Sequence, residues 1–79
     1  MKQDLPEVDM ELTGKIIKGY MKQNRMDVFD LALILRMRNT ASIYSWLRGD
    51  HLPNVNYLMQ MSHIFGCTIE DLLGVQKED

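Results

Sequence analysis

Few residues of this sequence have the chemistry of a catalytic or metal site. His51, His63 and Cys67 could each bind a metal ion, but three scattered ligands fall short of the four that a structural zinc site uses. We recognise no Ser, His and Asp set and no glycine-rich phosphate loop. With 79 residues, the chain is also too short to enclose a deep pocket. We therefore expect no enzyme activity, no metal, no cofactor and no small-molecule ligand.

The charged residues are distributed unevenly along the chain, whose net charge is −2. Between Gly14 and Gly66, seven side chains are basic and three are acidic, whereas the two flanks together hold two basic and eight acidic side chains. A basic middle between acidic ends is compatible with a nucleic-acid partner. Charge by itself, however, favours an ordinary solvated surface.

Apolar residues recur at helical spacing in five short segments, and no segment alternates with a period of two. These segments predict an all-α bundle with helices near 10–23, 28–35, 40–48, 55–65 and 69–73. Four residues provide the N-caps, with Asp71 completing a capping box in the last helix, and three glycines are expected to end helices. The caps are Asp27, Asn39, Asn54 and Thr68, and the glycines are Gly49, Gly66 and Gly74.

The same periodicity predicts which side chains face the core. In the second helix, Leu31, Ile34 and Leu35 are expected to point inward. Trp46 shares a face with Ile43, so it is predicted to be a core residue, whereas Tyr44 lies one step off that face and is expected to meet solvent or DNA.

Three segments carry a resemblance to a known family: Val28–Leu35 (VFDLALIL), Ile43–Pro53 (IYSWLRGDHLP) and Leu58–Leu73 (LMQMSHIFGCTIEDLL). Together they resemble the Xre/Cro-like, phage-repressor-like helix-turn-helix family over Gly14–Leu73. The resemblance implies a compact five-helix bundle in which the second and third helices read DNA. It also implies an operator-binding transcription regulator that acts as a dimer.

The resemblance assigns site residues position by position. It places four residues on the base-reading side of the third helix, namely Thr40, Ala41, Tyr44 and Ser45. It places six residues near the phosphate backbone, namely Val28, Arg36, Arg38, Asn39, Arg48 and Asn54. Both sets belong to the helix-turn-helix and the helix that follows it.

The expected organisation is a flexible arm over 1–9, a helix-turn-helix domain over 10–74 and a tail over 75–79. We expect a cytoplasmic protein, bacterial or phage-encoded and nucleoid-associated when bound, that has no membrane segment and binds double-stranded DNA. A homodimer on DNA is a further expectation. The alternative is a protein-interaction or antitoxin-like module of the same fold, with weak or lost DNA binding.

Overall fold

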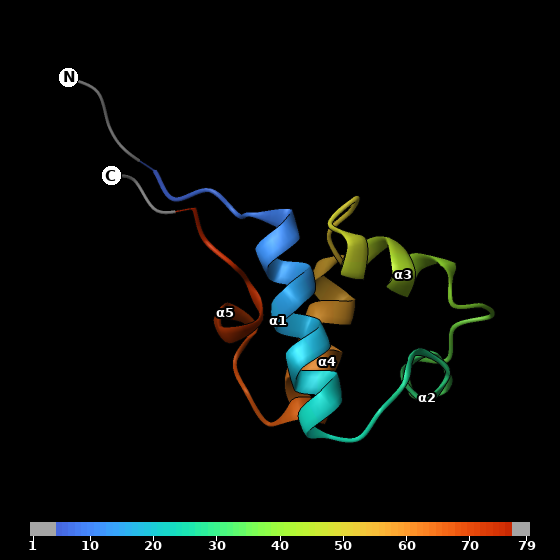
Figure 1. The fold of residues 1–79 in the computed structure, drawn as a ribbon. Coiled ribbons are helices and arrows are strands. Elements are labelled where there is room, and N and C mark those ends of the chain that lie inside the picture. Colours follow the sequence, from blue (N-terminus) through green and yellow to red (C-terminus); the bar gives the residue numbers. More distant parts are fainter. Residues whose placement is uncertain (1–4, 77–79) are drawn as a thin grey trace.

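The computed structural model describes residues 5–76 of the chain. Within this range the chain forms five helices and no strand, as the sequence predicted. They are α1 (Met10–Gln23), α2 (Val28–Ile34), α3 (Ala41–Arg48), α4 (Val55–Phe65) and α5 (Ile69–Leu72) (Figure 1). Every helix begins and ends within one residue of its predicted boundary.

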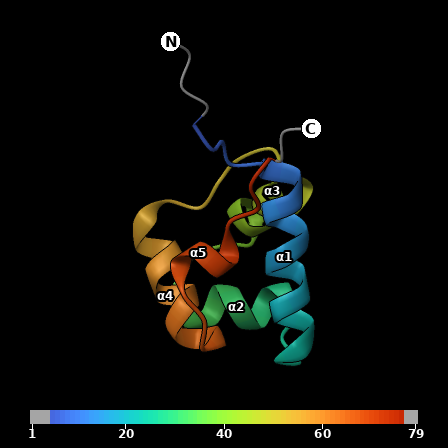
Figure 2. The same cartoon turned by 90° about the vertical axis from the view of Figure 1, so that its left-hand side faces the viewer.

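The helix α1 runs along one side of the bundle, and α4 lies on the opposite side of the core (Figure 2). The N-terminal half of α1 lies beside α3, and its C-terminal end lies near α2. The helix α1 packs most closely against α3, and one flank of α2 and of α3 faces outward.

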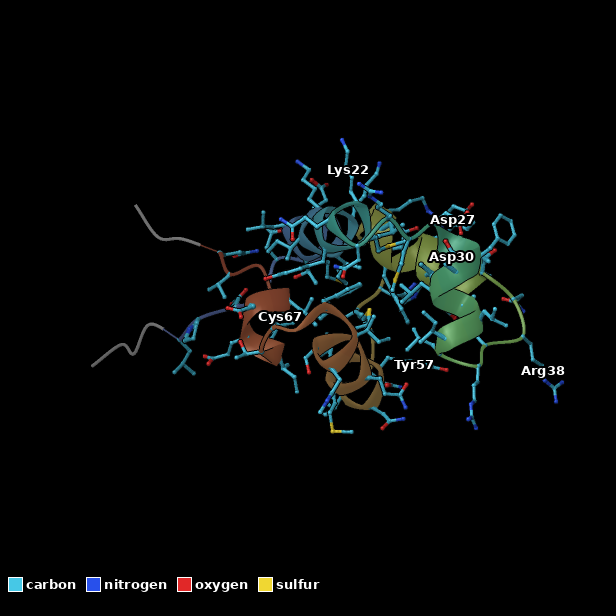
Figure 3. All side chains as sticks on the ribbon, turned by 90° about the horizontal axis from the view of Figure 1, so that it is seen from below. Lys22, Asp27, Asp30, Arg38, Tyr57 and Cys67 are labelled. Atoms are coloured by element: carbon cyan, nitrogen blue, oxygen red, sulfur yellow. The ribbon has the colours of Figure 1, made fainter. Side chains whose placement is uncertain are left out.

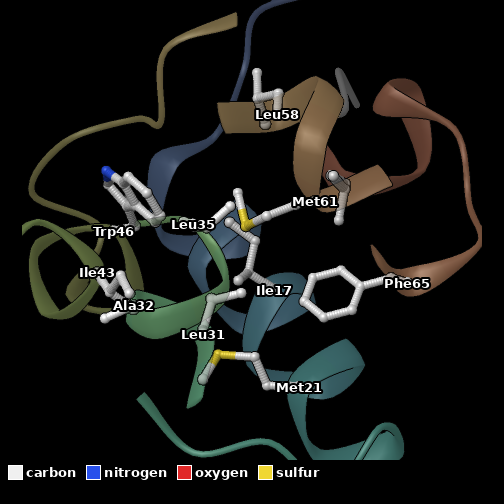
Figure 4. Packing of buried hydrophobic residues seen from close by; sticks show 11 residues of the cluster. Ile17, Met21, Leu31, Ala32, Leu35, Ile43, Trp46, Leu58, Met61 and Phe65 are labelled. Atoms are coloured by element: carbon white, nitrogen blue, oxygen red, sulfur yellow. The ribbon is translucent and has the colours of Figure 1, made fainter. Parts of the chain in front are cut away.

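Each helix contributes one fully buried apolar side chain to a shared core: Ile17, Leu31, Ile43, Met61 and Leu72. Figure 4 shows how the side chains of α1 to α4 meet in this cluster. Trp46 is buried among them, as predicted, and its ring lies 5.4 Å from that of Tyr57. Because every helix adds to one cluster, the position of α3 depends on the whole bundle.

Most of the predicted caps are confirmed. Asp27 and Asp30 form a capping box at the start of α2, and Thr68 and Asp71 form one at the start of α5. The side chain of Asn54 accepts a hydrogen bond from the Tyr57 backbone N–H at 2.8 Å. The predicted helix-ending glycines Gly49 and Gly66 also have the expected left-handed conformation, with φ of 83° and 69°.

The start of α3 differs from the prediction. Thr40, not Asn39, is the N-cap residue, and its side chain makes no capping hydrogen bond. The Asn39 side chain instead accepts a hydrogen bond from the Ala41 N–H, two residues on, at 3.0 Å. Asparagine readily makes this local turn, so Asn39 leads the chain into the helix and does not cap it.

The orientation of α2 also corrects one prediction. Leu31, Ala32 and Leu35 are buried, but Ile34 is 49% exposed. At 3.6 residues per turn, Ile34 lies roughly 100° from the centre of the buried face, so the prediction that it faces inward is wrong. Phe29 and Leu33 are even more exposed, at 69% and 79%. The outer face of α2 therefore carries three large apolar side chains beside the exposed Asp30.

The two ends of the described chain are hydrogen-bonded to each other. Val8 and Val75 form an isolated antiparallel bridge. The Asp9 N–H donates to the Gly74 carbonyl at 2.8 Å, and the Gln76 N–H donates to the Glu7 carbonyl at 2.9 Å. Of the arm and tail expected from the sequence, residues 1–4 and 77–79 lie outside the described residues.

Gly74 has a different role from the one predicted for it. The helix α5 ends at Leu72, and Leu73, in an extended conformation, is its C-cap. Gly74 is buried, and its N–H donates to the Thr13 hydroxyl at 2.8 Å. A β-carbon at residue 74 would lie 2.5 Å from the Leu12 side chain, so the absence of a side chain allows this close approach.

Candidate nucleic-acid interface

The helices α2 and α3 are joined by a turn over 35–40 that contains no glycine. Arg36 has φ of 59°, in the left-handed region that is costly for a residue with a β-carbon. The next residue, Met37, donates its N–H to the Ala32 carbonyl at 2.9 Å and packs against the core. This anchor holds the turn and sets the direction in which α3 starts.

The four predicted base-reading residues lie on one side of α3. Ala41 and Tyr44 are exposed, and Thr40 and Ser45 are half-buried. On a helical projection these four positions form one continuous sector, and the buried Ile43 and Trp46 occupy the opposite sector. The core contacts of α3 therefore hold this polar sector outward.

One of these side chains already has a partner. The Ser45 hydroxyl lies 2.6 Å from Nδ1 of His51. The bond forms because Gly49 turns the chain back at the end of α3, and the Asp50 N–H donates to the Ser45 carbonyl at 3.0 Å. His51 was not among the predicted site residues, since nothing in the sequence indicates which residues the chain reversal at Gly49 brings together.

The predicted phosphate contact at Arg48 is also engaged. Its Nε donates to the Asp50 carboxylate at 2.9 Å, and both side chains are largely exposed. The two terminal nitrogens of Arg48 take no part in that bond. An exposed ion pair of this kind contributes little to stability. Asp50 thus places a negative charge beside one end of the polar sector of α3.

Of the other predicted phosphate contacts, the two arginines are exposed, whereas Asn54 and Val28 are engaged within the fold. Arg36 and Arg38 are exposed, and Figure 3 shows Arg38 extending away from the bundle beyond the end of α2. The Asn54 side chain is used as the cap of α4. Val28 is half-buried against the core, so only its backbone N–H, at the start of α2, could donate to a phosphate.

A shallow groove of about 330 Å³ brings part of both predicted sets together with residues that the sequence did not single out. Arg38, Asn39 and Thr40 line it from the turn and the start of α3. Phe29 and Leu33 line it from α2. The apolar outer face of α2 therefore borders the predicted DNA-contact residues.

The shifted pKa values belong to residues far from this surface. Burial, followed by the nearby Cys67, raises the pKa of Tyr20, and burial raises the pKa of the Cys67 thiol. Hydrogen bonds from Thr68 lower the pKa of Asp71. Figure 3 shows Cys67 on the opposite side of the molecule from Arg38.

Residues 5–76 contain neither a candidate metal site nor a candidate membrane span. No group of three or more His, Cys, Asp or Glu side chains there is arranged to hold a metal ion. None of the helices in that range has both the length and the apolar character that crossing a bilayer requires.

Two short helices joined by a tight turn, the second with an outward polar face, make this five-helix structure a helix-turn-helix fold. The chain is similar to the DNA-binding domain of BldD, with a TM-score of 0.68 and 18% identity over 82% of this chain and 93% of that one. The BldD DNA-binding domain of S. venezulae gives the same score and identity and is covered to 96%.

The chain is also similar to part of an enzyme. The hydroxypropylphosphonic acid epoxidase from S. wedmorenis matches with a TM-score of 0.71 and 21% identity over 84% of this chain. The first of the matched HppE structures, the apo form, gives a TM-score of 0.71 and 20% identity. This chain spans only about a third of the length of these enzymes, 34% and 36% respectively. At such identities the likeness shows the fold.

Comparison with models of protein families gives no match for this sequence. Comparison with curated proteins gives none either.

Proposed function

We propose that this chain is a transcription regulator that binds double-stranded DNA sequence-specifically, with α3 in the major groove. The observation that carries the proposal is the polar sector of α3, which the core holds outward with an arginine near each end, Arg38 and Arg48. A B-DNA major groove accepts an α-helix and presents a distinct pattern of donors, acceptors and methyl groups for each base pair.

The side chains of the sector suggest how bases would be read. Thr40, Tyr44 and Ser45 carry hydroxyls that can donate or accept, and Ala41 offers a methyl group to a thymine methyl. None provides the two-pronged contact of Arg, Asn or Gln. We therefore expect part of the sequence preference to come from the shape and deformability of the DNA.

The phosphate contacts would position the helix. Arg36, Arg38 and Arg48 supply positive charge, while Asn39, Asn54 and the backbone N–H of Val28 supply neutral polar groups at or near helix starts. A single small domain contacts few base pairs, so two copies related by a two-fold axis would place two α3 helices about 34 Å apart, in successive major grooves.

The proposal extends to the type of regulator and the place where it acts. The helix-turn-helix fold and the sequence resemblance support an Xre/Cro-like regulator, encoded by a bacterium or phage and acting in the cytoplasm. Residues 10–74 would form its DNA-binding domain. We propose a non-enzymatic role, because the polar sector of α3 offers binding groups and the epoxidases share only about a third of their length with this chain.

The decisive experiment enriches random-sequence duplexes on the purified protein and then measures affinity at several salt concentrations. Specific binding should fall steeply with salt. Arg38→Ala should weaken all duplexes alike and reduce the salt slope by about one. Tyr44→Ala should instead change which sequences are preferred.

Lys22→Ala is the matched control, because Lys22 is an exposed basic residue that Figure 3 shows on a different side of the molecule. It should leave both affinity and preference unchanged. No retention of any duplex at low salt would refute the proposal. Equal losses from Lys22→Ala and Arg38→Ala would refute the assigned surface.

A second candidate is a protein-interaction module of the same fold. The observation that favours it is the apolar outer face of α2, since large exposed apolar side chains gathered on one face mark contact surfaces. Under this alternative the enrichment experiment would return no preferred duplex.

A further inference from the structure

The outer face of α2 carries three large apolar side chains that the fold leaves uncovered. Leu33 points directly away from the core at 79% exposure, with Phe29 and Ile34 on either side of it. We call these three residues the α2 strip. Their burial would remove apolar surface from water, which stabilises any complex that achieves it.

A groove borders each side of the α2 strip. The first, of about 330 Å³, lies between Phe29, Leu33 and the α2–α3 turn. The second, of about 450 Å³, lies between the end of α2 and α4, and its lining includes Ile34, Met59 and Ile64. A ridge with a groove on each side is the shape that a similar ridge from another helix can fill.

Charge is separated along the strip. Asp27 and Asp30 are exposed at the N-terminal end of α2, whereas Arg36 and Arg38 are exposed beyond its C-terminal end. Figure 3 shows Asp27 and Asp30 at one end of α2 and Arg38 past the other. Asp27 precedes the 7-residue helix, Asp30 lies in its first turn, and Arg36 follows its end; the helix itself is only about 10 Å long.

We propose that the α2 strip is a self-association surface and that its occupant is the α2 strip of a second copy of this chain, packed antiparallel. About a two-fold axis, the strip of one copy meets the same strip of the other. The acidic end of each copy then faces the basic end of its partner, twice in the dimer, while the apolar side chains meet in the middle. A parallel arrangement would instead oppose acid to acid.

The same charges argue against an anionic bilayer surface as the occupant. Such a surface, lying flat on the α2 strip, would be repelled by Asp27 and Asp30, which flank the apolar side chains. A second copy supplies both the apolar surface and the matching charges. Because the strip has only three large side chains, we expect a dimer that dissociates on dilution.

One consequence rests on the proposed function. Arg38, Asn39 and Thr40 line the groove beside Leu33 and Phe29, so the dimer would cover part of the predicted DNA-contact surface. Self-association through the α2 strip and DNA binding would then compete, and the two-fold pair proposed on DNA would have to use a different surface. The dimer itself is measured without DNA, so its failure and the failure of DNA binding can be told apart.

The test is sedimentation equilibrium of the purified chain over a wide range of concentration, in the absence of DNA. The wild-type protein should pass from monomer to dimer as concentration rises. Leu33→Glu should remain monomeric at concentrations at least tenfold higher. Val55→Glu is the matched control, because Val55 is 74% exposed and lines neither groove, and it should dimerise like the wild type.

Arg38→Glu tests the orientation separately. It should weaken the dimer at low salt, because an acid would then face the Asp27 and Asp30 of the partner copy. Circular dichroism should show that all variants keep their helices. A wild-type monomer at every concentration would overturn the proposal, and so would species larger than a dimer or equal losses from Leu33→Glu and Val55→Glu.

Discussion

Gly14 in α1 lies directly against the backbone of Trp46 in α3. A β-carbon at residue 14 would come within 2.5 Å of the Trp46 carbonyl oxygen and within 2.8 Å of the Leu47 carbonyl oxygen. Both neighbours are backbone atoms, which cannot rotate away. The glycine therefore sets how closely α1 and α3 approach. That distance in turn determines how far the exposed side of α3 lies from the core.

Gly14→Ala should consequently destabilise the fold by about 1–3 kcal/mol, since an extra methyl group in a close contact forces a shift of the backbone. Thermal or urea unfolding followed by circular dichroism measures the effect. Gly19→Ala is the control in the same helix, where a β-carbon would meet nothing within 4 Å. That variant should be more stable by about 0.5–1 kcal/mol. Equal behaviour of the two variants would contradict the close crossing.

The hydrogen bond between Gly74 and Thr13 gives a second prediction. Thr13 is fully buried, and Thr13→Val keeps its shape while removing the acceptor for the Gly74 N–H. A buried donor without a partner costs about 1–3 kcal/mol. Thr13→Ser keeps the acceptor and loses only a methyl group, which costs about 0.8 kcal/mol. Chemical unfolding should therefore rank Val below Ser, and the reverse order would show that the bond contributes little.

If the proposed function holds, the negative charge of Asp50 should lower the affinity for DNA. Asp50→Asn weakens the pairing of Arg48 and removes a negative charge beside α3. The variant should bind duplexes more tightly than the wild type at low salt, and the gain should shrink as salt screens the charges. Glu70→Gln removes the same charge from α5 and should change affinity little. A fluorescence-anisotropy titration in which both variants gain equally would indicate a mere effect of net charge.

Asp71 makes stability depend on pH at the acidic end. Hydrogen bonds from the Thr68 backbone and then its side chain lower the pKa of Asp71 in the folded chain. Between the folded and unfolded pKa values, the unfolded chain binds more protons. The stabilisation is therefore fully present above the unfolded pKa, about 3.9, and is lost as pH falls through the lower folded pKa.

Asp71→Asn lacks this titration. Its melting temperature should lie below that of the wild type at neutral pH, and the gap should close as the pH drops below 4. Melting curves recorded from pH 7 down to pH 2 would show this convergence. A gap that stays constant across the range would mean that the carboxylate charge does not stabilise the capping box.

The helices were predictable because their signals are local. Asp27, Asn54 and Thr68 cap their helices through residues three positions ahead, and Gly49 and Gly66 end helices through their own backbone freedom. Such contacts are visible in the order of residues alone. The burial of Trp46 followed for the same reason, from its spacing to Ile43.

The features that sequence reasoning missed depend on how the helices are packed. Ile34 matched a helical core spacing, yet the rotation of α2 against its neighbours turns this side chain outward. The contact of Gly14 with α3 joins residues far apart in the chain. The pairing of Ser45 with His51 depends on the turn made at Gly49. The predicted DNA contacts share this dependence, which is why they require direct measurement.

The antiparallel bridge between Val8 and Val75 also determines how the ends of the described chain would respond to a pulling force. The two bridged segments leave the bundle side by side. Tension applied across residues 7 and 76 would therefore separate their hydrogen bonds one after another, and would not load them all at once in shear. The hydrogen bonds from Gln76 to Glu7 and from Asp9 to Gly74 would then break in succession, outermost first. We expect this bridge to open at a low force, before the helices of the core that hold α3 are pulled apart.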